Sequence, residues 1–149
     1  MVSVLELLNR LKNLLESSEE LENIKFILNF NNSFVPKPFV EPTVVIGLNS
    51  INIKNGPFSG YVGTSDNTEY FGNESNIKIG LNIYVPRKIG SEENFNIFQK
   101  IYKVLFTNRE NIDVLNLNAK KISYDSDIGA FLLECEVLAF SFLVFKENS

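Results

Sequence analysis

Hydrophobic residues near the start of the chain recur with the spacing of a helix and then change to the spacing of a strand. Ser3 and Glu6 form a capping box, a pattern typical of helix starts. The apolar residues behind it fall at i, i+4, i+7 and i+11 and predict a helix over about residues 4–16: Val4, Leu8, Leu11 and Leu15. Alternation over residues 24–30 predicts a strand with one inward face.

A proline-rich stretch separates this strand from the next one. Pro36, Pro38 and Pro42 push the residues before them into extended geometry, so residues 31–42 are expected to form a loop or an edge crossing. Residues 43–54 are expected to form one bent or bulged strand. Its irregularity is expected near Gly47, Asn49 and Ser50.

Residues 55–76 are predicted to form a long loop, because glycine, asparagine and serine dominate the segment. Loops beyond about 12 to 15 residues are uncommon in compact domains and are usually functional or disordered. We therefore expect a partner surface here, carried by large aromatic side chains: Phe58, Tyr61, Tyr70 and Phe71. A short extra hairpin is the alternative.

The strictest alternation in the chain covers residues 77–85 and predicts a strand that Pro86 ends. Ser91 is expected to cap a second helix, with Glu92 and Glu93 in its first turn, where the helix dipole favours acids. An apolar stripe is expected to pack this helix on the sheet: Phe95, Phe98, Ile101, Tyr102, Leu105 and Phe106.

The C-terminal third is predicted to form a closing hairpin. Residues 114–124 and 128–145 are strand-like and flank the turn-prone tripeptide Asp125-Ser126-Asp127. Helices therefore alternate with runs of strands. This order predicts a single α+β domain over residues 1–149, with two helices packed on a mostly antiparallel sheet.

The last strand is apolar on both of its faces from residue 137 to residue 145. Helices on one side of the sheet would leave Phe140, Phe142 and Val144, or their neighbours, uncovered. Either the domain covers both sides of its own sheet or a neighbouring subunit supplies the second cover, and we expect the subunit.

Composition narrows the classes of function. The chain has 149 residues, with 18 acidic and 14 basic side chains and a net charge of -4, which disfavours nucleic-acid binding through charge. There is no His and only one Cys, which excludes Ser-His-Asp and Cys-His catalysis, histidine metal sites and intrachain disulfides. Charged residues interrupt each apolar stretch, so we expect neither a secretory signal nor a membrane helix.

The carboxylates of the closing hairpin have two possible chemical roles, a metal site and a catalytic pair. Asp125, Asp127 and Glu136 match calcium-loop positions 1, 3 and 12, but Ala130 occupies the position that requires glycine, so we reject the loop. Glu134 and Glu136 share one strand face, as a general-acid pair would. Without a third positioned group, solvated carboxylates are the favoured interpretation.

The remaining chemistry-bearing residues favour structural roles. Cys135 is expected to point to the opposite face from the two glutamates as a small buried hydrophobe with a raised pKa. The glycines at 56, 60 and 63 lack the Gly-Lys-Ser/Thr of a phosphate loop. Arg87 and Lys88 form a small basic tip, and we expect them to lie in a solvated loop without a chemical role. We therefore expect no catalytic, metal or cofactor residues.

The chain resembles the tail terminator (neck) proteins of bacteriophages and phage-tail-like contractile particles. The resemblance rests on element order over IKIGLNIYVPRKIGSEENFNIFQKIYKVLF at residues 77–106, on the helix before the first strand, and on the hairpin ISYDSDIGAFLLECEVLAFSF. It covers most of the chain and includes a few placed residues: Pro86, Gly90, Tyr124 and Asp125. Residues 55–76 match no family feature.

That resemblance implies a ring, commonly of six subunits, that caps the tail tube, ends its polymerisation and joins it to the neck. It implies no catalysis, no cofactor, no sequence-specific nucleic-acid contact and no membrane. The implied partners are further copies of the chain, the tube, and the sheath or neck, in a particle assembled in the bacterial cytoplasm. We expect contacts at Phe58, Tyr61, Tyr70, Phe71, Arg87, Lys88, Phe140 and Phe142.

Three alternatives stay open at this point. A baseplate or other head-tail joining protein would have the same composition and a different place in the particle. A small carboxylate-dependent enzyme would depend on Glu134 and Glu136. A ligand-binding module would be a monomer with an apolar pocket of a few hundred Å³.

Overall fold

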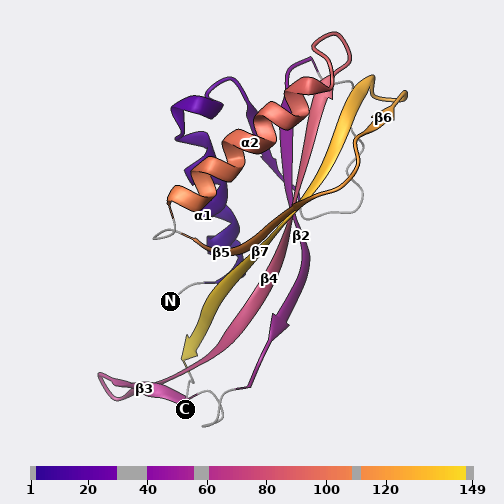
Figure 1. The fold of residues 1–149 in the computed structure, drawn as a ribbon. Coiled ribbons are helices and arrows are strands. Elements are labelled where there is room, and N and C mark those ends of the chain that lie inside the picture. Colours follow the sequence, from indigo (N-terminus) through magenta and orange to yellow (C-terminus); the bar gives the residue numbers. More distant parts are fainter. Residues whose placement is uncertain (1–2, 30–39, 56–60, 109–111, 147–149) are drawn as a thin grey trace.

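The fold is an α+β arrangement of one mixed sheet and two helices, as the sequence predicts (Figure 1). The computed structural model describes residues 3–29, 40–55, 61–108 and 112–146. Its elements follow in the order α1 (Val4–Glu16), η1 (Glu19–Leu21), β1 (Lys25–Leu28), β2 (Thr43–Ile53), β3 (Tyr61–Ser65), β4 (Thr68–Pro86), α2 (Glu92–Thr107), β5 (Asp113–Ala119), β6 (Ser123–Asp125) and β7 (Ala130–Lys146).

The sheet has the strand order β1-β2-β4-β7-β5, with β3 added to β4 and β6 added to β7. Among the described strands, the β1–β2 pair is parallel and the other five pairs are antiparallel. Both helices lie on one side of the sheet, so the domain has two layers (Figure 1). We call the side under the helices the helix-side face and the other side the helix-free face.

The core lies between the two helices and the helix-side face. Helix α1 begins as predicted, because Ser3 Oγ accepts a hydrogen bond of 3.1 Å from the Glu6 amide. Each fully buried Leu or Ile contributes about 2 kcal/mol through removal from water. The helix supplies Leu7, Leu8, Leu11 and Leu15, and β4 supplies Ile77, Ile79, Leu81, Ile83 and Val85.

Helix α2 is rotated relative to the predicted stripe. Phe95 and Tyr102, two predicted core residues, are 51% and 53% exposed. Asn94 lies fully buried instead, and its Nδ2 donates hydrogen bonds to the carbonyls of Ile83 and Phe131. These bonds orient the helix on β4 and β7. The predicted cap at Ser91 makes no side-chain cap bond. The buried residues of α2 are Asn94, Ile97, Ile101, Val104 and Leu105.

The predicted long loop over residues 55–76 is wrong, because residues 61–76 form strand β3 and the start of β4. The two strands meet in a tight hairpin in which Asp66 and Asn67 have φ of 52° and 64°. Asp and Asn tolerate this left-handed backbone better than other non-glycine residues, and two such residues suit a hairpin turn. The alternative of an extra hairpin is therefore correct. Phe58 lies outside the described residues.

The two longest strands extend past the helices. Strand β4 has 19 residues and β7 has 17, and at about 3.3 Å per residue β4 spans about 60 Å. The helices cover only part of this length (Figure 1). We call the projecting part the arm: residues 51–53 of β2, all of β3, residues 68–76 of β4 and residues 140–144 of β7.

Candidate functional site

The last strand keeps apolar side chains on the helix-free face. Leu138 and Phe140 are half-buried there and Phe142 is 41% exposed. Among the described residues, no helix lies on this side of the sheet (Figure 1). The strand is thus not fully enclosed within one chain, and cover by a neighbouring subunit stays a prediction.

The middle of the helix-free face holds a polar hollow of about 290 Å³. Lys120 Nζ lies 3.7 Å from Oε2 of Glu134, and Asn49 Nδ2 donates a 2.9 Å hydrogen bond to Oε2 of Glu136. The two glutamates therefore share one face, as the alternation predicts. The polar side chains around the hollow belong to four strands and one connection: Asn49, Asn82, Asn118, Lys120, Glu134 and Glu136.

Two local features bring Asn49 to Glu136. The predicted irregularity of β2 is a shift in register between Leu48 and Ser50, and Asn49 lies in it. Gly80 of β4 pairs with Glu136 of β7, and a Cβ at Gly80 would lie 2.9 Å from Asn49 Oδ1. The bulge and the glycine together let one side chain of β2 cross β4.

Cys135 lies between the two glutamates in β7 and borders the hollow. Cys135 pairs with Leu81 on the helix-side face, and burial raises the pKa of its thiol from 9.0 to about 12. Burial also raises the pKa of the Tyr84 hydroxyl, and the charges of Asp125 and Glu134 raise it further. This electrostatic environment stabilises the protonated forms of both groups at neutral pH.

The rejected calcium loop is a tight turn in the structure. The Asp127 amide donates a 2.9 Å hydrogen bond to Asp125 Oδ1, which closes the turn between β6 and β7. Within the described part of the chain, no group of three or more Asp, Glu, Cys or His is arranged to hold a metal ion.

The predicted aromatic contacts of the loop lie on the two faces of the arm. Tyr61, which is 47% exposed, contacts Phe71 edge-to-face with ring centroids 5.7 Å apart on the helix-side face. Tyr70 lies one residue earlier in β4 and therefore on the helix-free face, which it shares with Phe142. The arm thus separates these four residues into two surfaces.

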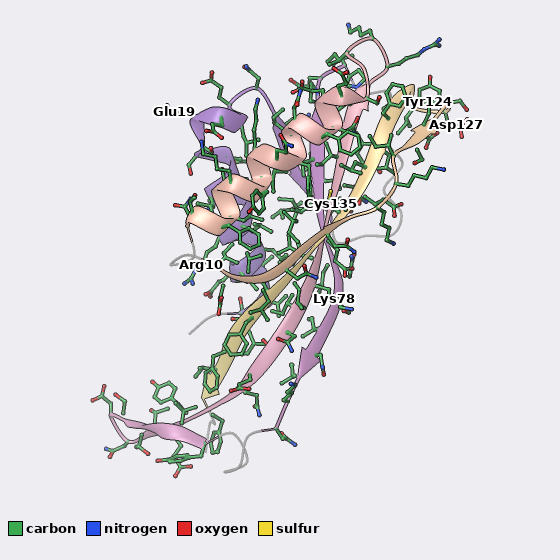
Figure 2. The ribbon with its side chains drawn as sticks, in the orientation of Figure 1. Arg10, Glu19, Lys78, Tyr124, Asp127 and Cys135 are labelled. Atoms are coloured by element: carbon green, nitrogen blue, oxygen red, sulfur yellow. The ribbon has the colours of Figure 1, made fainter. Side chains whose placement is uncertain are left out.

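The basic tip lies at the other end of β4, far from the arm. Arg87 and Lys88 are exposed, and the Arg87 amide donates a 3.0 Å hydrogen bond to the Gly129 carbonyl. They border a hollow of about 430 Å³ together with Val40, Pro86 and Gly129. Figure 2 shows Tyr124 and Asp127 at this same end of the sheet, opposite the arm. The predicted contact residues therefore form no single site.

The sequence did not indicate that several apolar side chains of the described residues would be exposed. Ile51 and Ile53 are 40% and 55% exposed at the end of β2, and Phe95 and Tyr102 lie on the outer side of α2. For Phe95 and Tyr102 the sequence did contain a signal, because α2 has more apolar residues than one face of a helix can bury.

No helix of the described segments is long and apolar enough to cross a membrane. A scan against protein-family models and a search of curated proteins found no match to this chain.

Proposed function

We propose that this chain is a structural assembly protein that forms a ring at the end of a phage or phage-like tail tube. The ring ends polymerisation of the tube and joins the tail to the neck. The observation that carries the proposal is the arm, which projects beyond the helices with exposed apolar side chains on both faces: Ile53, Tyr61 and Phe142. Such surfaces mark contacts with other protein subunits.

A ring requires each subunit to use two different surfaces, one toward each neighbour. The arm, the outer side of α2 and the basic tip at Arg87 and Lys88 are separate surfaces of this chain. The sheet also has open edges at β1 and β5 along its main path. These features support a heterologous contact better than a two-fold one.

The electrostatics support passage of DNA through such a ring without gripping it. The chain has a net charge of -4, and the hollow at the centre of the helix-free face holds two glutamates, Glu134 and Glu136, and one lysine, Lys120. Acidic side chains along a channel repel the phosphate backbone.

Native mass spectrometry tests the ring. Six copies of the 16.9 kDa chain have a mass of about 101 kDa, and we expect a cyclic oligomer of about this mass, alone or with tube protein. Electron microscopy of purified particles should place the chain at the neck end of the tube. A chain that stays monomeric both alone and with tube protein would contradict the proposal. If the chain were found at the baseplate, the alternative of a baseplate or other joining protein would replace this proposal.

Two glutamine variants test the enzyme alternative. Glu134→Gln and Glu136→Gln should leave assembly and tube capping unchanged. The contacts of these carboxylates, with Lys120 and Asn49, lie within one chain and do not involve a partner. Loss of a measurable hydrolytic activity with intact assembly would favour the enzyme instead.

A further inference from the structure

The two halves of β2 differ in how firmly burial fixes their register. Residues 43–46 are buried, whereas residues 48–53 are all exposed. Burial specifies the register of a strand, because a shift of one residue would turn its buried apolar side chains to the opposite face. Burial therefore fixes the first half of β2 on β4 but does not fix the second half.

The second half of β2 is displaced by one residue relative to the first. Asn49 is the extra residue of the bulge, because Leu48 and Ser50 pair with consecutive residues of β4. Beyond the bulge, Ile51 and Ile53 pair with odd-numbered residues of β4 and so lie on the helix-side face. The bulge thus decides which face of the arm carries these two isoleucines.

A second register exists for the same residues. If Asn49 entered the strand ladder, Ile51 and Ile53 would lie opposite Asn76 and Glu74, on the helix-free face. These two residues of β4 pair with two aromatic residues of β7: Phe140 and Phe142. Polar and apolar residues alternate over residues 50–53, so the segment suits either register. Something other than its own pattern must select one of them.

The side chain of Asn49 distinguishes the two registers. In the observed register its Nδ2 donates a 2.9 Å hydrogen bond to Glu136 Oε2, and it reaches β7 across Gly80, which has no side chain. In the shifted register Asn49 would lie opposite Lys78, whose side chain would stand between Asn49 and β7. The hydrogen bond is therefore specific to the bulged register.

We propose that the Asn49–Glu136 hydrogen bond selects between two registers of residues 50–53 and thereby decides which face of the arm carries Ile51 and Ile53. Loss of the bond lets Asn49 enter the ladder and moves these residues one position along β4. A partner that binds the isoleucines on one face shifts the balance toward the register that places them there. The inference concerns a single chain and holds whether or not the chain forms a ring.

Disulfide cross-linking in the full-length chain distinguishes the registers. The background is Cys135→Ala, which removes the one native cysteine. Asn52→Cys with Asn76→Cys reports the observed register, in which the two positions lie opposite each other. Ile51→Cys with Asn76→Cys reports the shifted register. In the observed register this second pair points to opposite faces and cannot form a bridge. The rate of oxidation by oxidised glutathione measures each pair.

The expected rates depend on the hydrogen bond. With Asn49 and Glu136 intact, the first pair should oxidise at least about tenfold faster than the second. Asn49→Val should speed the second pair by about tenfold or more, because valine removes the bond and suits a regular strand. Glu136→Ala should act in the same direction, but Glu136→Gln should not, since its amide oxygen still accepts the bond. Asn118→Val is the matched control, because it replaces another asparagine beside the same hollow.

Three outcomes would overturn the inference. The first is a second pair that oxidises no faster in Asn49→Val and Glu136→Ala than in the parent chain. The second is rapid oxidation of both pairs in the parent chain, because the bond would then select nothing. The third is a slower first pair without a faster second pair, which would mean that the end of β2 detaches from β4. Circular dichroism should confirm that each variant folds, and either Asn49→Val or Glu136→Ala suffices if the other does not.

Discussion

Asn49 Nδ2 donates a 2.9 Å hydrogen bond to Glu136 Oε2, although the two residues belong to β2 and β7 and β4 lies between them. Gly80 lies under the crossing side chain, where a Cβ would come within 2.9 Å of Asn49 Oδ1. The bulge that releases Asn49 also changes which residues of β2 face the helices. Before the bulge Ile46 lies on the helix-side face, and after it Ile51 does.

The contact predicts non-additive effects of two substitutions. Gly80→Ala should lower the free energy of unfolding by about 1 kcal/mol, because the new methyl group displaces Asn49 from Glu136. In an Asn49→Ala background the same change should cost nothing or stabilise slightly, since alanine suits a strand better than glycine. Urea unfolding of the four proteins measures this cycle. Simple additivity would show that the side chain does not cross β4.

A second glycine, Gly72, should tolerate substitution by alanine less well than Gly80 does. At Gly72 in the arm, a Cβ would lie 2.5 Å from Phe142 Cε1 and 3.0 Å from the Leu143 carbonyl oxygen. Phe142 can rotate away but the backbone cannot, so Gly72→Ala should destabilise by about 2 kcal/mol and more than Gly80→Ala. Hydrogen exchange should show the loss in arm amides first. Equal stability of Gly72→Ala and the wild type would place β4 and β7 farther apart than the structure does.

Replacement of Asn94 by aspartate should be among the most damaging changes. The Asn94 amide nitrogen bonds two carbonyl oxygens, and its Oδ1 is a buried acceptor without a partner in the described structure. A carboxylate there would face those carbonyls, so Asn94→Asp should cost about 3 kcal/mol or more at pH 7.

This cost should depend on pH in a defined direction. Burial raises the pKa of a carboxyl group, so the folded Asn94→Asp variant binds its proton at a higher pH than the unfolded chain does. Its stability should therefore improve relative to the wild type as the pH falls from 7 to 4. Asn94→Leu has no titrating group and should show no such improvement. Urea unfolding at both pH values provides the comparison.

Cys135 should be unreactive in the folded protein. Burial raises the pKa of its thiol to about 12, so alkylation by iodoacetamide at pH 8 should require urea. Between pH 9 and 12 the unfolded chain loses the thiol proton while the folded chain keeps it. Stability should fall by up to about 1.4 kcal/mol per pH unit from this group, and Cys135→Ala should lack that part of the slope. Rapid labelling of the native protein would show that the thiol is accessible.

Much of the fold could be predicted because its signals are short-range. The capping box at Ser3 and the spacing of its leucines define α1 without reference to other elements. The alternation from Ile77 to Val85 likewise identifies a strand, and the turn at Asp125 identifies the closing hairpin. Fold class follows from the order of such elements. These features depend on residues a few positions apart.

The candidate surfaces could be predicted only in part. The sequence predicted Tyr61 and Phe71 to be contact residues but placed them in a loop, because hairpins rich in glycine and asparagine have weak strand signals. It identified an apolar stripe on α2 but could not assign its rotation, because Phe95 and Asn94 both begin regular helical spacings. Asn94 lies inward because it reaches two strand carbonyls.

The sequence by itself determined the types and order of most elements, the absence of histidine chemistry and the acidic balance. The tertiary structure decided which of those elements extend past the helices and which apolar residues stay exposed. It also decided that Asn49 meets Glu136, 87 positions away. Such contacts depend on strand register, and a shift of one residue turns every side chain to the opposite face. The local spacing of residues does not specify the register. The register is set by packing of the whole sheet against its helices.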